Sequence, residues 1–166
     1  NLYQAGKDAD AAAKAYEEAL KADPNHVVSA VELGAIELLI RKDAEKGAAV
    51  VEQALTEERR PLLGPAELAR GLALKGESLT MQFKLKEATA EFEQALKLDP
   101  TSLYAKAGLG KVLIAQRQYS EAVPLFKQAT EADPPDLVYT DGYLTARIAT
   151  GKMDDAFKQL ESANAR

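Results

Sequence analysis

The stretch of sequence that decides the fold is written twice in this chain. Residues 85–100 read LKEATAEFEQALKLDP, and residues 119–134 read YSEAVPLFKQATEADP. In each copy an alanine, a phenylalanine and a second alanine follow at intervals of four and three residues, and a proline stands five residues further on. Positions with this spacing share one face of an α-helix, and proline disfavours helix in the residue before it. Each copy therefore predicts a helix with a small–large–small apolar face and a defined end.

The two copies begin 34 residues apart, and the pattern continues in both directions. The corresponding positions in the other copies, two before and one after, are Ala12, Tyr16, Ala19 and Pro24, then the weaker Gly47, Val51 and Ala54, and last Ala156, Leu160 and Ala163. A fixed period of this length is typical of stacked helical hairpins. One hairpin buries only part of its apolar face by itself, so neighbouring hairpins must stack to complete the core.

This period and these residue types resemble the tetratricopeptide repeat family. Gly76 and Gly110 match the small residue of that family's first helix, and Leu109 completes the Leu-Gly pair in front of Gly110. Leu79 and Leu113 stand where the family usually carries tyrosine. The resemblance covers essentially the whole chain. It implies an all-α fold, a right-handed α-solenoid of antiparallel helix pairs with about five repeats, the first of them truncated.

We expect a single array over residues 1–166, with repeats at 1–26 (partial), 27–61, 62–102 (with an insertion), 103–136 and 137–166. Helices are expected at 8–22, 28–41, 44–58, 65–83, 86–98, 102–116, 119–132, 136–150 and 153–164. Repeat one keeps only the end of its first helix, Asn1–Ala5, and no extra polar capping helix follows the last one. Because terminal repeats of such arrays need capping, we expect the array to be a segment of a longer protein.

Repeat two departs from its sister repeats in the register of its first helix. Either Leu33-Gly34 or Gly34-Ala35 can occupy the paired position. We favour the second register because it puts Leu38 rather than Glu37 in the buried position.

An insertion of about seven residues, Leu62 to Leu68, follows repeat two. Pro65 and Glu67 form a helix-start signal, so most of the insertion is expected to lengthen the next helix. Two interpretations of Leu62 and Leu63 remain open: these leucines staple the loop onto the core, or they form a loop that contacts a partner.

Composition excludes several classes of function. The chain has no cysteine, and its 28% of charged residues give a net charge of −5 with both signs interspersed. Without clustered Lys and Arg, nucleic acid is not an expected partner. No apolar run approaches the ~20 residues that cross a bilayer, so no membrane insertion is expected within this segment. The segment carries no targeting signal, and its composition suits either the cytoplasm or a bacterial periplasm.

Nothing in the sequence predicts catalysis, a cofactor or a metal site. The glycine spacing from Gly71 to Ser78 resembles a phosphate-binding loop, but Glu77 replaces the essential lysine, and no strand precedes it. His26, the only histidine, follows a proline turn and has no second histidine or cysteine to complete a metal site. We therefore expect a non-enzymatic protein, with His26 at the surface.

The resemblance also implies where a partner binds. In the family, first helices line a concave surface, and repeat positions 2, 5, 9, 12 and 13 reach the ligand. Arg70 and Tyr104 are the best single anchors among the positions carried over, because arginine and aromatic residues dominate binding hot spots. The predicted groove residues are Leu39, Arg70, Glu77, Met81, Tyr104, Lys111, Ile114, Asp141 and Ile148, and the carried-over positions also include Ser29, Glu32, Ile40 and Val138.

One subtype of the family is not expected. Arrays that clamp a C-terminal carboxylate use lysine and asparagine at positions 5 and 9. Here repeat three offers Ala73 and Glu77 at those positions, and repeat four offers Ala107 and Lys111.

The leading expectation is a protein-protein interaction module that holds an extended or helical protein or peptide segment in its concave groove. The alternative is a structural or self-assembly spacer of a larger protein, such as a bacterial envelope or secretion assembly factor. The open first repeat motivates this alternative, since it exposes part of an apolar face that includes Tyr16 and Leu20. Self-association is therefore also possible.

Overall fold

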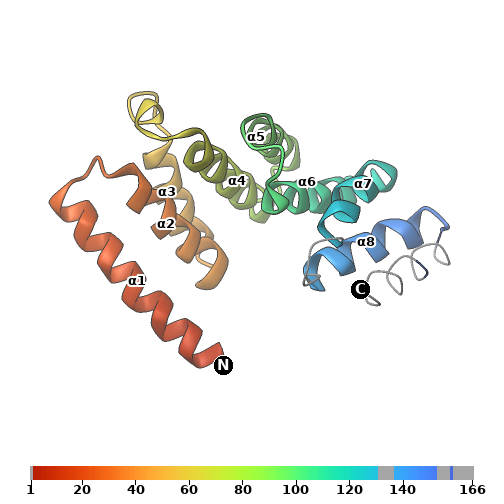
Figure 1. Ribbon diagram of the computed structural model, residues 1–166, viewed down its shortest axis with the longest axis horizontal. Helices are drawn as coiled ribbons and strands as arrows, with labels where there is room; N and C mark the ends of the chain where they lie inside the picture. Colours follow the sequence, from red (N-terminus) through yellow and green to blue (C-terminus); the bar gives the residue numbers. More distant parts are fainter. Residues whose placement is uncertain (1, 131–136, 153–157, 159–166) are drawn as a thin grey trace. The chain divides into compact units, whose positions relative to one another are not determined.

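A computed structural model describes residues 2–130, 137–152 and 158 of the chain, and all regular elements within them are helical (Figure 1). This confirms the predicted all-α architecture. The α-helices are α1 (Leu2–Ala22), α2 (Val27–Ala35), α3 (Ala44–Ala54), α4 (Pro65–Met81), α5 (Leu85–Leu98), α6 (Leu103–Ala115), α7 (Tyr119–Thr130) and α8 (Leu137–Ala149). A π-helix, η1 (Ile36–Ile40), continues α2, and a short 3₁₀ helix, η2 (Arg60–Leu62), lies between α3 and α4.

The chain divides into two compact units, Asn1–Pro100 and Thr101–Arg166, which we call unit 1 and unit 2. In unit 1, α2 with η1 pairs with α3, and α4 pairs with α5. The first helices α2 and α4 also touch each other, as expected for stacked hairpins. In unit 2, α7 packs against both α6 and α8, and α6 contacts α8.

Helix α1 packs against α2 and η1 in unit 1 (Figure 1). The contact is a cluster of Ala9, Ala13, Leu33 and Ile36, with Tyr16 and Leu20 partly buried against it. The expected break between the segment Asn1–Ala5 and the helix at 8–22 is wrong, because α1 runs continuously from Leu2. The stretch is rich in alanine and contains no proline, and one glycine costs only about 1 kcal/mol in a helix.

Other helix ends follow from capping groups. Asp43 accepts a hydrogen bond from Lys46 N at 2.9 Å to begin α3, and Pro65 occupies the first turn of α4 as predicted. Helix α3 ends at Ala54, four residues before the expected end. The side chains of Arg59 and Arg60 turn back there and donate to the backbone carbonyls of residues 53 and 55, which satisfies acceptors at the helix end. The helix expected at 153–164 lies outside the described residues.

Glycines in the first helices let large side chains of the second helices approach closely. In unit 2 the ring of Phe126 is fully buried between Gly110 of α6 and Gly142 of α8. A Cβ atom added at Gly110 would lie 2.5 Å from Phe126 Cε2, and one added at Gly142 would also overlap the ring. In unit 1 the pair Gly76 and Phe92 repeats the contact, with an added Cβ 2.9 Å from Phe92 Cε2.

We predict that Gly110→Ala lowers the free energy of unfolding by about 1–2 kcal/mol, because the cost of overpacking exceeds the gain in helix propensity. The ring of Phe126 cannot retreat, since Gly142 holds its other side. The matched control is Gly71→Ala, whose Cβ would approach only the end of a flexible side chain closely, Leu55 Cδ2 at 3.0 Å, with its next neighbours at 3.6 Å. Urea denaturation measures both variants, and equal stabilisation by the two substitutions would contradict the contact. Phe126→Leu is expected to restore part of the loss in the Gly110→Ala background.

The register of repeat two is resolved by η1. Each turn inside a repeat is marked by a left-handed residue, Lys42 with φ 59° and Arg117 with φ 63°. Gly110 precedes its turn residue by seven positions, whereas Gly34 precedes Lys42 by eight. The π-helix absorbs the additional residue. Gly34 therefore faces Val51 as Gly110 faces Phe126.

The favoured register, with Gly34-Ala35 in the paired position, is therefore correct only for the residues that follow the π-helix. Leu38 is buried at the position of Leu113, four residues before the turn residue, as expected. Its side chain lies so close to Gly47 that an added Cβ would be 2.5 Å from Leu38 Cγ, which explains glycine where sister repeats carry alanine. Before the π-helix the favoured register is wrong by one residue. Ser29 is buried rather than groove-facing, and its hydroxyl lies 2.7 Å from Nδ1 of His26, the N-cap of α2.

The turn between α4 and α5 holds a phenylalanine in the left-handed region. Phe83 has φ 59° and its side chain is 87% exposed, while the corresponding turn after α8 uses Gly151 at φ 73°. This conformation costs a residue with a Cβ roughly 1–2 kcal/mol.

We predict that Phe83→Gly raises the free energy of unfolding by about 0.5–1 kcal/mol, since relief of backbone strain exceeds the entropy that glycine adds to the unfolded chain. Phe83→Ala is the control, because it removes the exposed ring and keeps the strained backbone. Thermal and urea melts of the two variants should differ, and identical stabilities would rule out strain at this turn.

Candidate functional site

The predicted groove residues all lie on the first helices of hairpins, but they fall in both units. Leu39 belongs to η1, and Arg70, Glu77 and Met81 belong to α4. In unit 2, Tyr104, Lys111 and Ile114 lie on α6, and Asp141 and Ile148 lie on α8. Because α2 and η1 contact α4, and α6 contacts α8, each unit brings its own members onto adjacent helices. We call the two sets the unit 1 face and the unit 2 face.

The unit 1 face combines an ion pair with aliphatic side chains. Arg70 is exposed and donates from Nη2 to Glu32 Oε2 at 3.0 Å, which links α4 to α2. Leu39 and Met81 are half-buried, and Ile40 beside them in the sequence is 53% exposed. An acidic group of a partner would therefore meet a guanidinium that already has one carboxylate neighbour.

The unit 2 face is more open. Lys111 and Asp141 are exposed, with one charge on each of the two helices. Ile148 is 51% exposed, while Tyr104 and Ile114 are half-buried. The face therefore presents an apolar strip with a cation on α6 and an anion on α8.

Exposed large apolar side chains are concentrated on first helices. Among the described residues they are Val28, Ile40, Val138 and Ile148 on first helices, Leu98 at the end of a second helix, and Leu62 and Phe83 in connections. Ile40, Val138 and Ile148 occupy carried-over repeat positions. Packing inside the array thus leaves apolar surface at positions where the family resemblance expects a ligand.

Sequence reasoning missed a charged network around Glu37. This residue is only 1% exposed, and its Oε1 accepts from Arg41 Nη1 at 2.6 Å and from Lys46 Nζ at 2.7 Å. Arg41 also pairs with Asp10 at 2.6 Å, and Lys46 with Glu17 at 3.2 Å. The network joins α1, η1 and α3. Only the spacing of Glu37 and Arg41, one helical turn apart, was visible as a signal in the sequence.

The network holds its cations in their charged forms. The hydrogen bond to Asp10, followed by the interactions with Glu37, raises the pKa of Arg41 against the opposing effect of burial. Hydrogen bonds to Glu37 and then Glu17 raise the pKa of Lys46 above its usual 10.5. A buried carboxylate with two cationic donors is satisfied, so this cluster is structural rather than catalytic.

We predict that Lys46 stabilises the fold fully below pH 10.5, its ordinary pKa, and that this stabilisation is lost as the pH rises through the higher folded-state value. The free energy of unfolding of Lys46→Met should lie below that of the parent chain at about pH 8, and the gap should narrow as the pH is raised above 10.5. Lys86→Met is the control, an exposed lysine of α5 without an ion pair among the described residues. A gap that does not change with pH would contradict this role.

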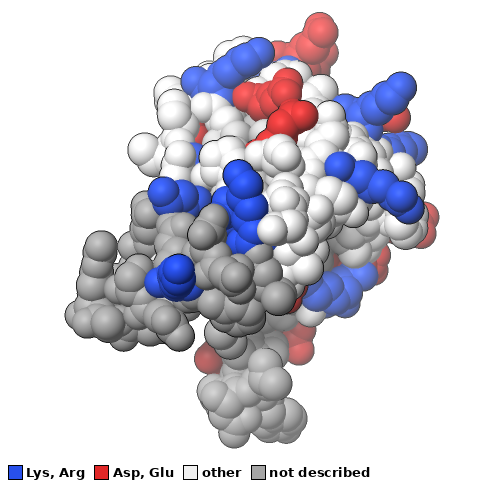
Figure 2. Space-filling model, turned by 90° about the vertical axis from the view of Figure 1, so that its right-hand side faces the viewer, with Lys and Arg blue, Asp and Glu red and all other residues white. Residues whose placement is uncertain are grey.

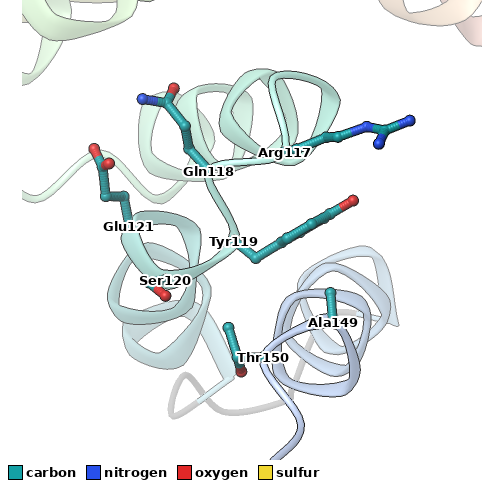
Figure 3. A pocket seen from close by; sticks show the side chains of 7 residues that line it. All are labelled: Arg117, Gln118, Tyr119, Ser120, Glu121, Ala149 and Thr150. Atoms are coloured by element: carbon teal, nitrogen blue, oxygen red, sulfur yellow. The ribbon is translucent and has the colours of Figure 1, made fainter.

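A hollow of about 400 Å³ in unit 2 lies between the α6–α7 turn and the end of α8 (Figure 3). Its lining residues are Arg117, Gln118, Tyr119, Ser120, Glu121, Ala149 and Thr150. Figure 3 shows Arg117 and Tyr119 extending to one side and Gln118 and Glu121 to the other, so their polar ends do not converge on one point. These four side chains therefore do not form a cluster of converging polar groups.

Three further observations bear on the type of ligand. Within the described part of the chain, no group of three or more His, Asp or Glu residues could hold a metal ion. None of the described helices is long and apolar enough to cross a membrane. On the face in Figure 2, lysines and arginines are scattered among acidic and uncharged residues and form no continuous basic stripe.

These features define the chain as a protein of tandem antiparallel helical hairpins with exposed apolar positions on its first helices. The sequence profile of the tetratricopeptide repeat matches residues 79–148, and a second profile of the same repeat matches residues 1–26. The chain belongs to the tetratricopeptide repeat family. Proteins of this family are in general interaction modules without enzymatic activity, and the chain has the fold of a protein-interaction module.

Solved structures share the fold. The chain is similar to TTC0263, a thermophilic protein of this family from Thermus thermophilus, with TM-score 0.73 and 20% identity over 98% of this chain and 84% of that one. It is also similar to MamA, with TM-score 0.70 and 21% identity over 98% and 90% of the two chains. YrrB matches with TM-score 0.64 and 19% identity over 98% and 80%. None of the curated proteins matches the sequence.

Proposed function

We propose that the chain holds an extended or helical peptide segment of another protein on its first helices. The observation that carries this proposal is the exposure of Ile40, Val138 and Ile148 at repeat positions that reach ligands in the family. Apolar side chains half or more exposed are candidates for contact surface when they gather on one type of helix. The similarity to YrrB, a protein of this family with an unusual peptide-binding site, supports the same class of ligand.

The charges on the two faces suggest what the segment looks like. The unit 2 face carries the exposed Lys111 on α6 and the exposed Asp141 on α8 together with the apolar side chains of Tyr104, Ile114 and Ile148. A partner with apolar side chains and one charge of each sign complements this composition, and the two opposite charges set its direction. A transient contact of this kind buries on the order of 1,000 Å² or less.

A display library of random peptides, selected on the purified chain, tests the proposal. We expect selected peptides to lose about tenfold in affinity for Ile148→Asp and for Lys111→Glu, measured by fluorescence anisotropy, because the first change removes an apolar contact and the second reverses a charge of the face. Lys127→Glu is the matched control, an exposed lysine on the second helix α7.

Equal affinities for Lys111→Glu and Lys127→Glu would overturn the assignment to the first helices. Sedimentation of the same samples distinguishes the alternative function. Association that depends on protein concentration, with no selectable peptide, would favour a self-assembly module instead.

A further inference from the structure

The insertion between repeats two and three builds a second hollow in unit 1, apart from the first-helix faces. It measures about 280 Å³ and lies where η2, the first turns of α4 and the last turn of α5 meet. Its lining residues are Arg60, Leu68, Leu72, Gln94, Lys97 and Leu98. None of these residues belongs to the unit 1 face, so the hollow is a separate feature.

The wall supplied by the insertion is held in place. Leu63 is only 8% exposed and anchors the loop between α3 and α4 (yellow in Figure 1), whereas Leu62 is 59% exposed. The burial of Leu63 agrees with its interpretation as a staple, and Leu62 remains accessible to solvent. Arg60 donates from Nε to the carbonyl of Leu55 at 2.9 Å, which fixes its side chain at the hollow. The hollow is preformed rather than created by a flexible loop.

The floor of the hollow is apolar and its rim is cationic. Leu72 is buried, Leu68 is half-buried and Leu98 is 41% exposed at the edge. Arg60 and Lys97 contribute the only charges of the lining, and neither forms an ion pair with a described residue. A free phosphate does not suit a leucine floor, because it requires backbone N–H or polar donors on several sides. An apolar side chain flanked by carboxylates matches both the floor and the rim.

We propose that this hollow is a docking site for an acidic peptide segment. One large apolar side chain, such as leucine or phenylalanine, enters between Leu68, Leu72 and Leu98. Carboxylates on the neighbouring residues of the segment pair with Arg60 and Lys97. This site is independent of the first-helix faces, and either site can be occupied without the other.

The probe is a short synthetic peptide with a central leucine flanked by glutamates, titrated into the full chain labelled at its leucine and isoleucine methyl groups. We expect methyl shifts at Leu68, Leu72 and Leu98 and not at Ile148. Two control peptides isolate the contributions: one replaces the leucine by serine, and the other replaces the glutamates by lysines. Neither should bind.

The protein variants form a matched pair on one helix. Lys97→Glu should weaken binding about tenfold, because it replaces an attraction by a repulsion at the rim. Lys86→Glu makes the same charge change on α5 outside the hollow and should change affinity less than about twofold. Leu98→Gln should also weaken binding, and thermal melts of all three variants establish that each is folded.

Several results would overturn the proposal. One is the absence of methyl shifts at millimolar peptide, and another is an equal loss of affinity in Lys97→Glu and Lys86→Glu. Shifts at these leucines that appear on raising the protein concentration without peptide would assign the hollow to a second copy of the chain.

Discussion

The close contact between a glycine of one helix and a large side chain of the next is the constraint on which the hairpins depend. Phe126 fills the space between α6 and α8 because neither Gly110 nor Gly142 has a Cβ atom there. If either helix carried a larger residue, the helices would separate and the fully buried ring would lose contacts on both sides. Unit 1 uses the same device with Gly76 and Phe92. The 34-residue period therefore reflects one kind of packing contact that is repeated along the chain.

Because these contact partners are close in sequence, the pattern predicted the hairpins and most helix ends. It could not predict the π-helix, since an additional residue leaves the apolar pattern of repeat two readable in two registers. Gly34 follows one register and Leu38 the other, and only the backbone between them reconciles the two. The burial of Glu37 was equally hidden, because one of its two cationic partners, Lys46, comes from the following helix. Charge compensation of this kind depends on tertiary structure rather than on local pattern.

The candidate site, too, could be predicted from the sequence only in part. Its placement on first helices followed from the repeat positions, whereas the accessibility of each side chain did not. Ile148 is half exposed and Ile114, at the same repeat position, is half-buried, because neighbouring helices cover them differently. Arg70 pairs with Glu32, which lies 38 residues earlier in the sequence. Repeat position therefore predicts which helix a candidate binding residue belongs to, while packing decides how much of its side chain is exposed.

The insertion shows how a repeat protein acquires a surface of its own. Within the regular hairpins, residues that form the glycine–aromatic contacts cannot vary without loss of stability, and stacking consumes most of the remaining apolar surface. A hollow with its own shape therefore needs chain outside the period. The segment between α3 and α4 provides it, with Leu63 inserted into the core and Arg60 tied to the backbone of the preceding turn. The additional turn of α4, which begins at Pro65, then brings Leu68 to the hollow. The loop that interrupts the repeat is therefore tied to the core by Leu63 and to the preceding turn by Arg60, while its second leucine, Leu62, stays exposed.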